Sequence, residues 1–323
     1  MTIANTTSSL PHTHESADLL PFISDSLLSV FLPVVAYWVY SLMYELLDYC
    51  NFSFLEPFRI HTPEELKKNR VSKGKVVWWV FLQQVLQAML ALALTSGVEE
   101  TGVNQGATLA WHQAWIAKSV GTLGMEAYLT SMLNGPAVEQ LARWMYWYVE
   151  PAVRFFVAMF ILDAYQYFLH RLFHTNKFLY KHLHSVHHRL YVPYAYGALY
   201  NHPIEGFVMD SVGGGLAYFL SGMTVKSAAI FFTFSTIKTV DDHSGYDFPW
   251  NPLQLFFNNN AKYHDIHHQP VGIKANFSQP FFTLWDRLLG TYAPTLEACR
   301  EANLRRKKEK DSGSESEQSR KDQ

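Results

Sequence analysis

Long apolar runs alternate with polar segments in the first third of the chain. The run from Leu27 to Leu47 carries a single acid, Glu45, near its end. A second run, Val76 to Ser96, contains three glutamines, which indicates a face packed against protein rather than lipid. A helix of about 20 apolar residues is long enough to cross a hydrocarbon core of roughly 30 Å. The pattern therefore predicts two transmembrane helices.

Two further apolar stretches, residues 144–169 and 205–240, lie later in the chain. The first is interpreted as a third span. The second is broken by glycines at 213–215 and 222, and histidine-rich segments flank it on both sides. Those segments can meet only if an even number of crossings separates them. We therefore expect a short helical hairpin with its turn near residues 222–226. Its glycines admit either a lipid chain or another helix, and both alternatives stay open.

Basic residues are distributed unevenly around the first span. Residues 1–26 contain no Lys or Arg, whereas six basic residues lie between Arg59 and Lys75. Loops on the cytoplasmic side of a membrane carry an excess of basic residues. The pattern predicts a lumenal N-terminus, with the 59–75 loop and the C-terminal tail in the cytosol.

Eleven of the fifteen histidines lie between His170 and His268, and eight of them form clusters spaced H-x3-H, H-x2-H-H and H-x2-H-H. Residues three and four apart share a helix face, so each cluster can direct several imidazoles at one point. Eight ligands exceed the four positions of a tetrahedral zinc site, so two metal ions fit the count better. The predicted ligands are His170, His174, His184, His187, His188, His264, His267 and His268.

Two other histidines, His202 and His243, lie where the apolar hairpin meets the predicted cytosolic side, and both are candidate ligands. A further set is expected to orient ligands, since carboxylates and neighbouring polar groups often support metal-bound imidazoles. For Asp163, which lies inside the third span, pairing with another helix is the alternative role. The supporting candidates are Asp163, Asp242, Asp265 and His182.

Two kinds of chemistry use histidine-bound metals. Iron with imidazole ligands can activate dioxygen and oxidise an unactivated C–H bond. Hydrolysis by zinc-activated water needs three ligands and an open position, usually with an acid placed as in H-E-x-x-H. Neither H-x2-H-H cluster contains a glutamate, although His264-Asp265 partly imitates that pattern. The surplus of histidines favours a two-metal oxidase at a membrane face.

Three segments carry a resemblance to a known family: residues 181–208 (KHLHSVHHRLYVPYAYGALYNHPIEGFV), 238–253 (KTVDDHSGYDFPWNPL) and 263–292, which holds the last cluster. They resemble the fatty acid hydroxylase superfamily of membrane di-iron enzymes, which includes sterol desaturases, methyl-sterol oxidases and sphingolipid hydroxylases. The sequence that flanks the clusters is most similar to fungal sphinganine C4-hydroxylases. The resemblance covers roughly residues 150–292.

The resemblance implies an all-α integral membrane protein, in which a cytosolic helical cap carries two iron ions held by the eight cluster histidines. It implies O2-dependent hydroxylation of sphinganine or dihydroceramide at C4 in the endoplasmic reticulum membrane. Electrons would come from NADPH or NADH through cytochrome b5. Some relatives in the superfamily carry a fused cytochrome b5 domain with a His-Pro-Gly-Gly motif. Here His202-Pro203 is followed by Ile-Glu, so the cytochrome and its reductase are expected to be separate proteins. The alternatives are a sterol C5-desaturase or C4-methyl sterol oxidase, and a non-catalytic membrane protein that binds metal.

Composition agrees with a membrane protein. Hydrophobic residues make up 49% and charged residues 17%, which is below the ~25% typical of soluble domains. The net charge of −2 gives no indication of nucleic-acid binding, and two cysteines exclude a cluster held by four thiolates. We expect a lumenal polar segment (1–26), N-terminal spans with a lumenal loop (27–143), a catalytic domain (144–295) and a disordered cytosolic tail (296–323).

Overall fold

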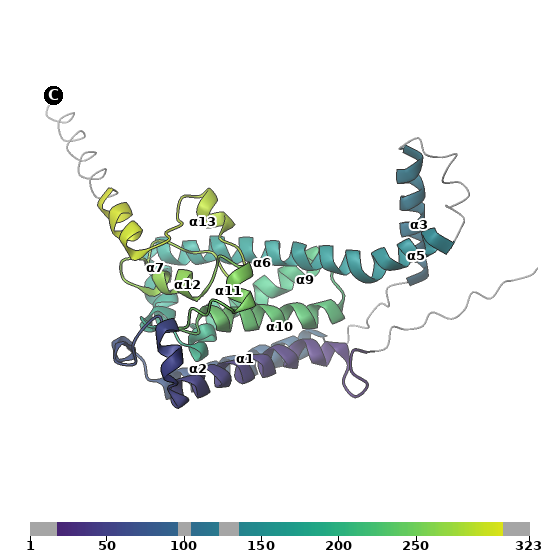
Figure 1. The fold of residues 1–323 in the computed structure, drawn as a ribbon. Coiled ribbons are helices and arrows are strands. Elements are labelled where there is room, and N and C mark those ends of the chain that lie inside the picture. Colours follow the sequence, from purple (N-terminus) through teal and green to yellow (C-terminus); the bar gives the residue numbers. More distant parts are fainter. Residues whose placement is uncertain (1–17, 96–104, 123–135, 306–323) are drawn as a thin grey trace, which may run out of the picture.

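The computed structural model describes residues 18–95, 105–122 and 136–305, and Figure 1 shows their arrangement. These residues form helices and no β-strand. Three helical segments are long and apolar enough to cross a membrane: Asp25–Cys50, Lys73–Leu94 and Val138–Thr175. The predicted all-α membrane fold is confirmed. The N-terminal residues 1–17, part of the predicted lumenal loop and residues 306–323 lie outside the described ranges.

The first two predicted spans correspond to α1 (Asp25–Cys50) and α2 (Lys73–Thr95). Helix α1 begins at Ser24, whose hydroxyl accepts the N–H of Leu27, and ends at Asn51 in the left-handed conformation. Between the two helices lie the short 3₁₀ segments η1 (Ser53–Phe58) and η2 (Glu65–Lys68).

The third span is longer than predicted. Helix α5 (Pro136–Trp144), the π-helix η3 (Met145–Val149) and α6 (Glu150–Thr175) follow one another without a break. Pro151 does not interrupt them, because it lies in the first turn of α6, after the π-helix, where its missing N–H costs little. The helix continues past His170, where the third span is predicted to end, so His170 and His174 lie on α6 itself.

The predicted hairpin is present. It consists of α8 (Pro203–Gly206), the π-helix η6 (Phe207–Val212), α9 (Gly213–Ser221) and α10 (Val225–Asp242). Its turn contains Gly222 at φ +64°, a left-handed conformation that favours glycine. Helix α9 packs along α6, and α10 packs along α1.

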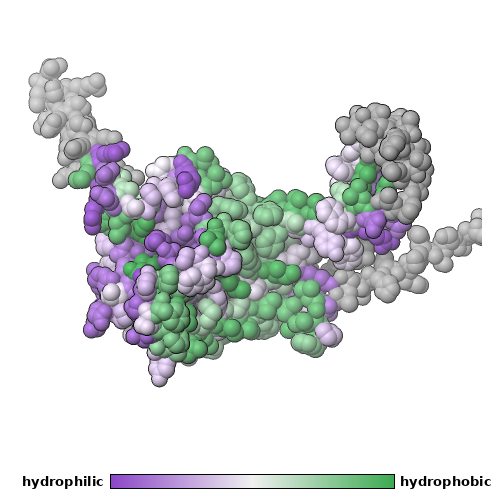
Figure 2. All heavy atoms as spheres, in the orientation of Figure 1, coloured by the Kyte–Doolittle hydropathy of each residue, from purple (hydrophilic) through white to green (hydrophobic). Residues whose placement is uncertain are grey.

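Short elements gather at one end of these long helices. They are α7 (Lys177–His182), η4 (His184–Arg189), η5 (Ala195–Leu199), α11 (Pro252–Phe256), α12 (Ala261–His268) and α13 (Leu284–Leu288). Helix α3 (Gln105–Thr122) lies beside α5 near the opposite end. Figure 2 shows hydrophilic residues concentrated at the end that carries α7 and α12, a largely apolar surface along the long helices, and a smaller hydrophilic patch near α3 and α5.

A buried carboxylate joins this end to α1. Oδ1 of Asp241 on α10 accepts the hydroxyl of Tyr44 at 2.7 Å and that of Tyr40 at 3.1 Å. The amide of Asn251 donates to the same oxygen at 2.5 Å. Buried polar groups are costly unless they are paired, so these contacts fix α10 against α1.

The disordered tail was predicted to begin at residue 296, which is too early. Residues 296–305 are helical, and Leu296 and Cys299 pack against Ile266 of α12. The apolar face of this segment therefore has a partner, which the charged composition of the tail as a whole did not indicate.

Candidate metal centre

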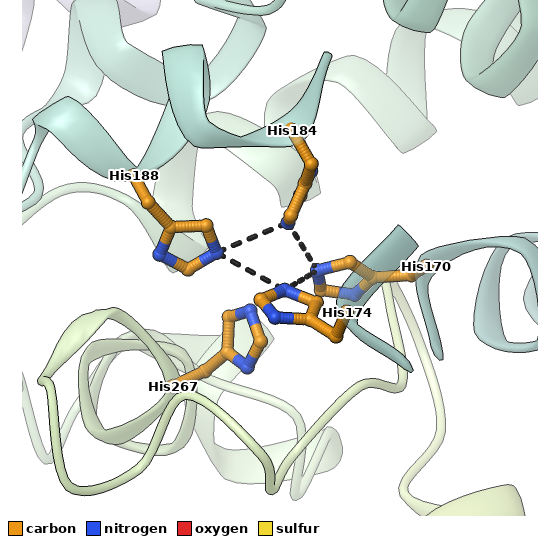
Figure 3. A group of neighbouring side chains, drawn as sticks. All are labelled: His170, His174, His184, His188 and His267. Carbon is orange, nitrogen blue, oxygen red and sulfur yellow. Dashed lines mark hydrogen bonds between the residues drawn. The ribbon is translucent and has the colours of Figure 1, made fainter. Parts of the chain in front are cut away.

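Five histidines from three elements point toward one another in Figure 3: two from α6, two from η4 and His267 from α12. Nε2 of His184 lies 3.1 Å from Nε2 of His170 and 3.0 Å from Nε2 of His188. Nε2 of His174 lies 3.2 Å from that of His170 and 3.1 Å from that of His188. All five ligand atoms lie within 4.8 Å of one another.

A second group lies beside the first and contains His187, His243, His264 and His268. Nε2 of His264 is 3.0 Å from Nε2 of both His243 and His268. The rings of His187 and His188, which are neighbours in the chain, belong to different groups. The doublet in η4 thus supplies one ligand to each group, and the chain offers two adjacent metal positions.

The other ring nitrogen, Nδ1, is anchored in six of the nine imidazoles. A neutral imidazole carries one N–H, so an Nδ1 that donates to a carbonyl oxygen leaves a lone pair on Nε2. The anchors are Phe277 O for His170, Tyr200 O for His187, Thr239 O for His243, Ala275 O for His267, Leu190 O for His268 and the Glu205 carboxyl for His184.

This arrangement fits metal ions. A backbone carbonyl can only accept a hydrogen bond, so the five carbonyl anchors leave a lone pair on Nε2 of their rings. Nε2 of His267 is buried and has no partner in the described part of the chain. Neighbouring Nε2 atoms lie 3.0–3.2 Å apart, and two lone pairs at that distance repel each other unless a cation lies between them. Imidazole nitrogens are good ligands for iron, zinc and copper, so a metal in each group would satisfy all of them.

Burial keeps these rings neutral. It lowers the pKa of His187 to about 4, and burial together with neighbouring imidazoles lowers the pKa of His264 and His268 well below the usual 6.5. A metal ligand must be unprotonated, so the site is ready to bind metal at neutral pH.

Glu205 is a site residue that the sequence analysis missed. Its carboxyl contacts Nδ1 of His184 and is 2% exposed. Carboxyl groups in this position orient ligating histidines. The available signal was that Glu205 is the first acid in the chain after the second histidine cluster.

A second missed residue is Asp286 on α13. Its carboxylate accepts the N–H groups of Phe277 and Ser278, at 3.0 and 2.6 Å, and the hydroxyl of Tyr263. These bonds fix the segment whose carbonyl at Phe277 anchors His170. Asp286 therefore positions the first group through the backbone.

The structure brings together all eight cluster histidines and His243, but it leaves His202 out of both groups. His202 precedes Pro203, and its Nδ1 accepts the N–H of Ile204 at the start of α8. It caps a helix, which corrects its assignment as a candidate ligand.

In the described part of the chain, none of the four supporting candidates forms a hydrogen bond with a cluster imidazole. Asp163 instead accepts the N–H groups of Phe281 and Phe282, at 2.9 and 3.1 Å, and so fixes the loop before α13. Asp242 forms a buried ion pair with Lys238 one turn earlier on α10. Both carboxylates serve packing rather than ligand orientation.

The other two candidates lie farther out. Asp265 accepts from His61 at 2.7 Å, because its side chain points away from the face of α12 that carries the ligands. His182 is exposed and packs its ring against Phe178, with centroids 4.6 Å apart. Their expected role in orienting ligands is corrected accordingly.

Comparisons with known proteins agree with this geometry. A family model described as fatty acid hydroxylase matches residues 155–291. Sphingolipid C4-hydroxylase sur2 of Schizosaccharomyces pombe is 47% identical over 265 residues, covering 81% of this chain and 86% of the relative. The chain belongs to the fatty acid hydroxylase family.

Two other relatives of this chain carry different names. Very-long-chain aldehyde decarbonylase GL1-9 of Oryza sativa subsp. indica is 42% identical over 84% of this chain and 91% of the relative. Methylsterol monooxygenase 1 of Gallus gallus is 38% identical over 51% of this chain and 53% of the relative. No solved structure matches.

Proposed function

We propose that this protein is a sphingolipid C4-hydroxylase, which inserts one oxygen atom of O2 at C4 of sphinganine or dihydroceramide. The observation that carries the proposal is the pair of histidine groups in a chain that matches a named C4-hydroxylase over most of its length. The sterol oxidase alternative has weaker support, since the named sterol relative matches only about half of either chain.

The residues that would hold two iron ions are the five histidines of the first group and the four of the second. Iron bound there would supply activation of O2 and oxidation of a C–H bond, which no side chain performs alone. The chain's own contribution is orientation: five backbone carbonyls and Glu205 fix the rings before any metal binds. Phe277 packs against His170, His174 and His267 and keeps water from that side.

Electrons would enter from a separate donor, cytochrome b5 with its NAD(P)H-dependent reductase. His174 is the one ligand of the nine that is not fully buried, and the ring of Tyr180 lies 5.5 Å from it. Tyr180 lies on α7, where Lys177 and Lys181 are exposed. No acid occurs between residues 176 and 190, so this surface suits an acidic donor protein.

Because the basic loop at 59–75 is expected on the cytoplasmic side, the site would face the cytosol at the endoplasmic reticulum membrane.

Lipid analysis tests the proposal. The protein is expressed in cells that lack their own C4-hydroxylase, and long-chain bases are quantified beside cells that express His184→Ala. We expect 4-hydroxylated bases with the wild-type protein alone. Loss of the product in the variant would also exclude a non-catalytic metal-binding protein. Formation of alkanes or of oxidised sterol intermediates, without 4-hydroxylated bases, would reject the assignment.

A further inference from the structure

A group of buried polar atoms without partners lies next to the first histidine group. Four buried atoms have no hydrogen-bond partner among the described residues. They are Oε2 of Glu205, the amide oxygen and nitrogen of Gln83, and Oδ2 of Asp210. Glu205 is 2% exposed and Gln83 is 4% exposed. Buried polar groups of this kind are costly, and they call for a specific explanation when several occur together.

Gly206 lies against one of these side chains. A Cβ at Gly206 would lie 2.3 Å from Nε2 of Gln83, so the Gln83 amide occupies the space that a side chain would fill. One turn along α2, Nε2 of Gln87 donates to Gly206 O at 3.2 Å, and the Gln87 side chain also contacts the Asp210 carboxyl. Asp210 follows Gly206 by four residues, about one turn, along the adjoining helices α8 and η6. Helix α2, α8 and the π-helix η6 thus enclose one polar site.

The chemistry of the unpartnered atoms defines what they would bind. Three are oxygens, on Glu205, Asp210 and Gln83, and one is the Gln83 nitrogen. Among the described residues, the one salt-bridge contact of Glu205 is to His184, which burial keeps neutral, and Asp210 has none. A complementary ligand must bring several N–H or O–H donors and a positive charge. In membrane proteins, ionisable residues inside the apolar region mark substrate or ion sites.

We propose that Glu205, Asp210 and Gln83 bind the polar head of the substrate, and that this head is the ammonium and hydroxyl groups of a free long-chain base. The inference rests on the proposed function, which makes a sphingoid lipid the substrate. An amino-diol head supplies the donors that the three oxygens lack. The nitrogen of an N-acylated base is an uncharged amide, so the site discriminates against ceramides.

The location agrees with the reaction. The imidazole of His184 alone separates Glu205 from the point where the first group converges, since Nδ1 contacts Glu205 while Nε2 faces His170 and His188. In a long-chain base, C4 is only a few bonds from the nitrogen. Ile204 and Phe207, on either side of Glu205 and Gly206, are exposed apolar residues, so a lipid can approach this site from the bilayer.

A binding measurement without metal tests the inference. Detergent-solubilised full-length protein is stripped of metal with a chelator and titrated with sphinganine and with N-acetylsphinganine. A charge-assisted hydrogen bond contributes ~1.5–3 kcal/mol, so the wild-type protein should bind sphinganine about tenfold more tightly or better. Asp210→Asn should remove most of that preference. Asp247→Asn, at an exposed carboxylate paired with Lys262, is the matched control and should keep it.

If Asp210→Asn weakens the binding of both lipids equally, or weakens the binding of neither lipid, the proposed head-group site is rejected and the carboxylate serves packing. Should that variant fail to fold, Gln83→Met provides the second test. It should reduce the preference for sphinganine over 1-deoxysphinganine, and an unchanged preference would reject the site. Binding is measured on the metal-free protein, so a chain that binds sphinganine through Asp210 yet forms no C4 product would overturn the proposed function alone.

Discussion

At the scale of single residues, the direction of each imidazole is set by its anchor rather than by its position in a cluster. His187 and His188 are adjacent in the chain, yet they belong to different groups, because Tyr200 O holds one ring toward the second group. His202 has the same chemistry, but its Nδ1 is used at the start of α8. Membership in the site is therefore a matter of what each ring nitrogen contacts.

This argument predicts different outcomes for two histidine substitutions. His267→Ala should lower product formation by about 100-fold or more, since loss of a ligand exceeds the 10–100-fold typical of outer-shell changes. His202→Ala should stay close to wild type in turnover, with a loss of about 1 kcal/mol in stability from the missing cap. Product and bound iron are measured at equal amounts of membrane-inserted protein. Loss of iron from His202→Ala would show that the two groups are assigned incorrectly.

At the scale of elements, the glycines of α9 serve helix packing at one position and are unconstrained at another. A Cβ at Gly213 would lie 2.9 Å from the ring of Tyr165 on α6, whereas a Cβ at Gly215 would meet no atom within 4 Å. Gly213 thus allows α9 to approach α6. This favours packing over a lipid groove at that position, the alternative that the sequence left open.

The two glycines form a matched pair for mutation. Gly213→Ala should destabilise the protein by ~1–3 kcal/mol, because the Tyr165 ring must move in a packed interface. Gly215→Ala should be neutral or stabilising by up to ~1 kcal/mol, since alanine is the better helix former. Melting temperatures in detergent, together with turnover of bases of two chain lengths, decide the matter. A selective loss of the longer substrate in Gly215→Ala would restore the groove.

The elements differ in how far their sequences determine them. Length and hydropathy were enough for α1 and α2, and Gly222 was enough for the hairpin turn. Continuity through Pro151 was missed, because a π-helix before α6 moves the proline to a tolerated position. Cluster spacing was enough to select eight histidines that the structure brings together, and position was enough to add His243. Glu205 could not be paired with His184 from sequence, since 21 residues separate them and only the packing of α8 brings them together.

At the scale of the whole molecule, polar residues collect at the end that holds the histidines, and the long helices expose apolar side chains. The direction of insertion is predicted from the basic residues at 59–75. We expect a tag placed after residue 323 to be digested by protease added to sealed microsomes, whereas a tag before residue 1 should be protected. The opposite pattern would place the metal site in the lumen.

The wide separation of the ligands along the chain also limits when the site can be assembled. The first ligand, His170, and the last, His268, both belong to groups that need α6, η4, α10 and α12 together. At ~5–20 residues per second, a ribosome needs on the order of 5–20 s to travel from one to the other. Helix α6 is therefore synthesised before the last cluster exists. In the proposed di-iron enzyme, iron loading would be a late, post-translational step, and a shortage of iron would leave inserted but inactive protein in the membrane.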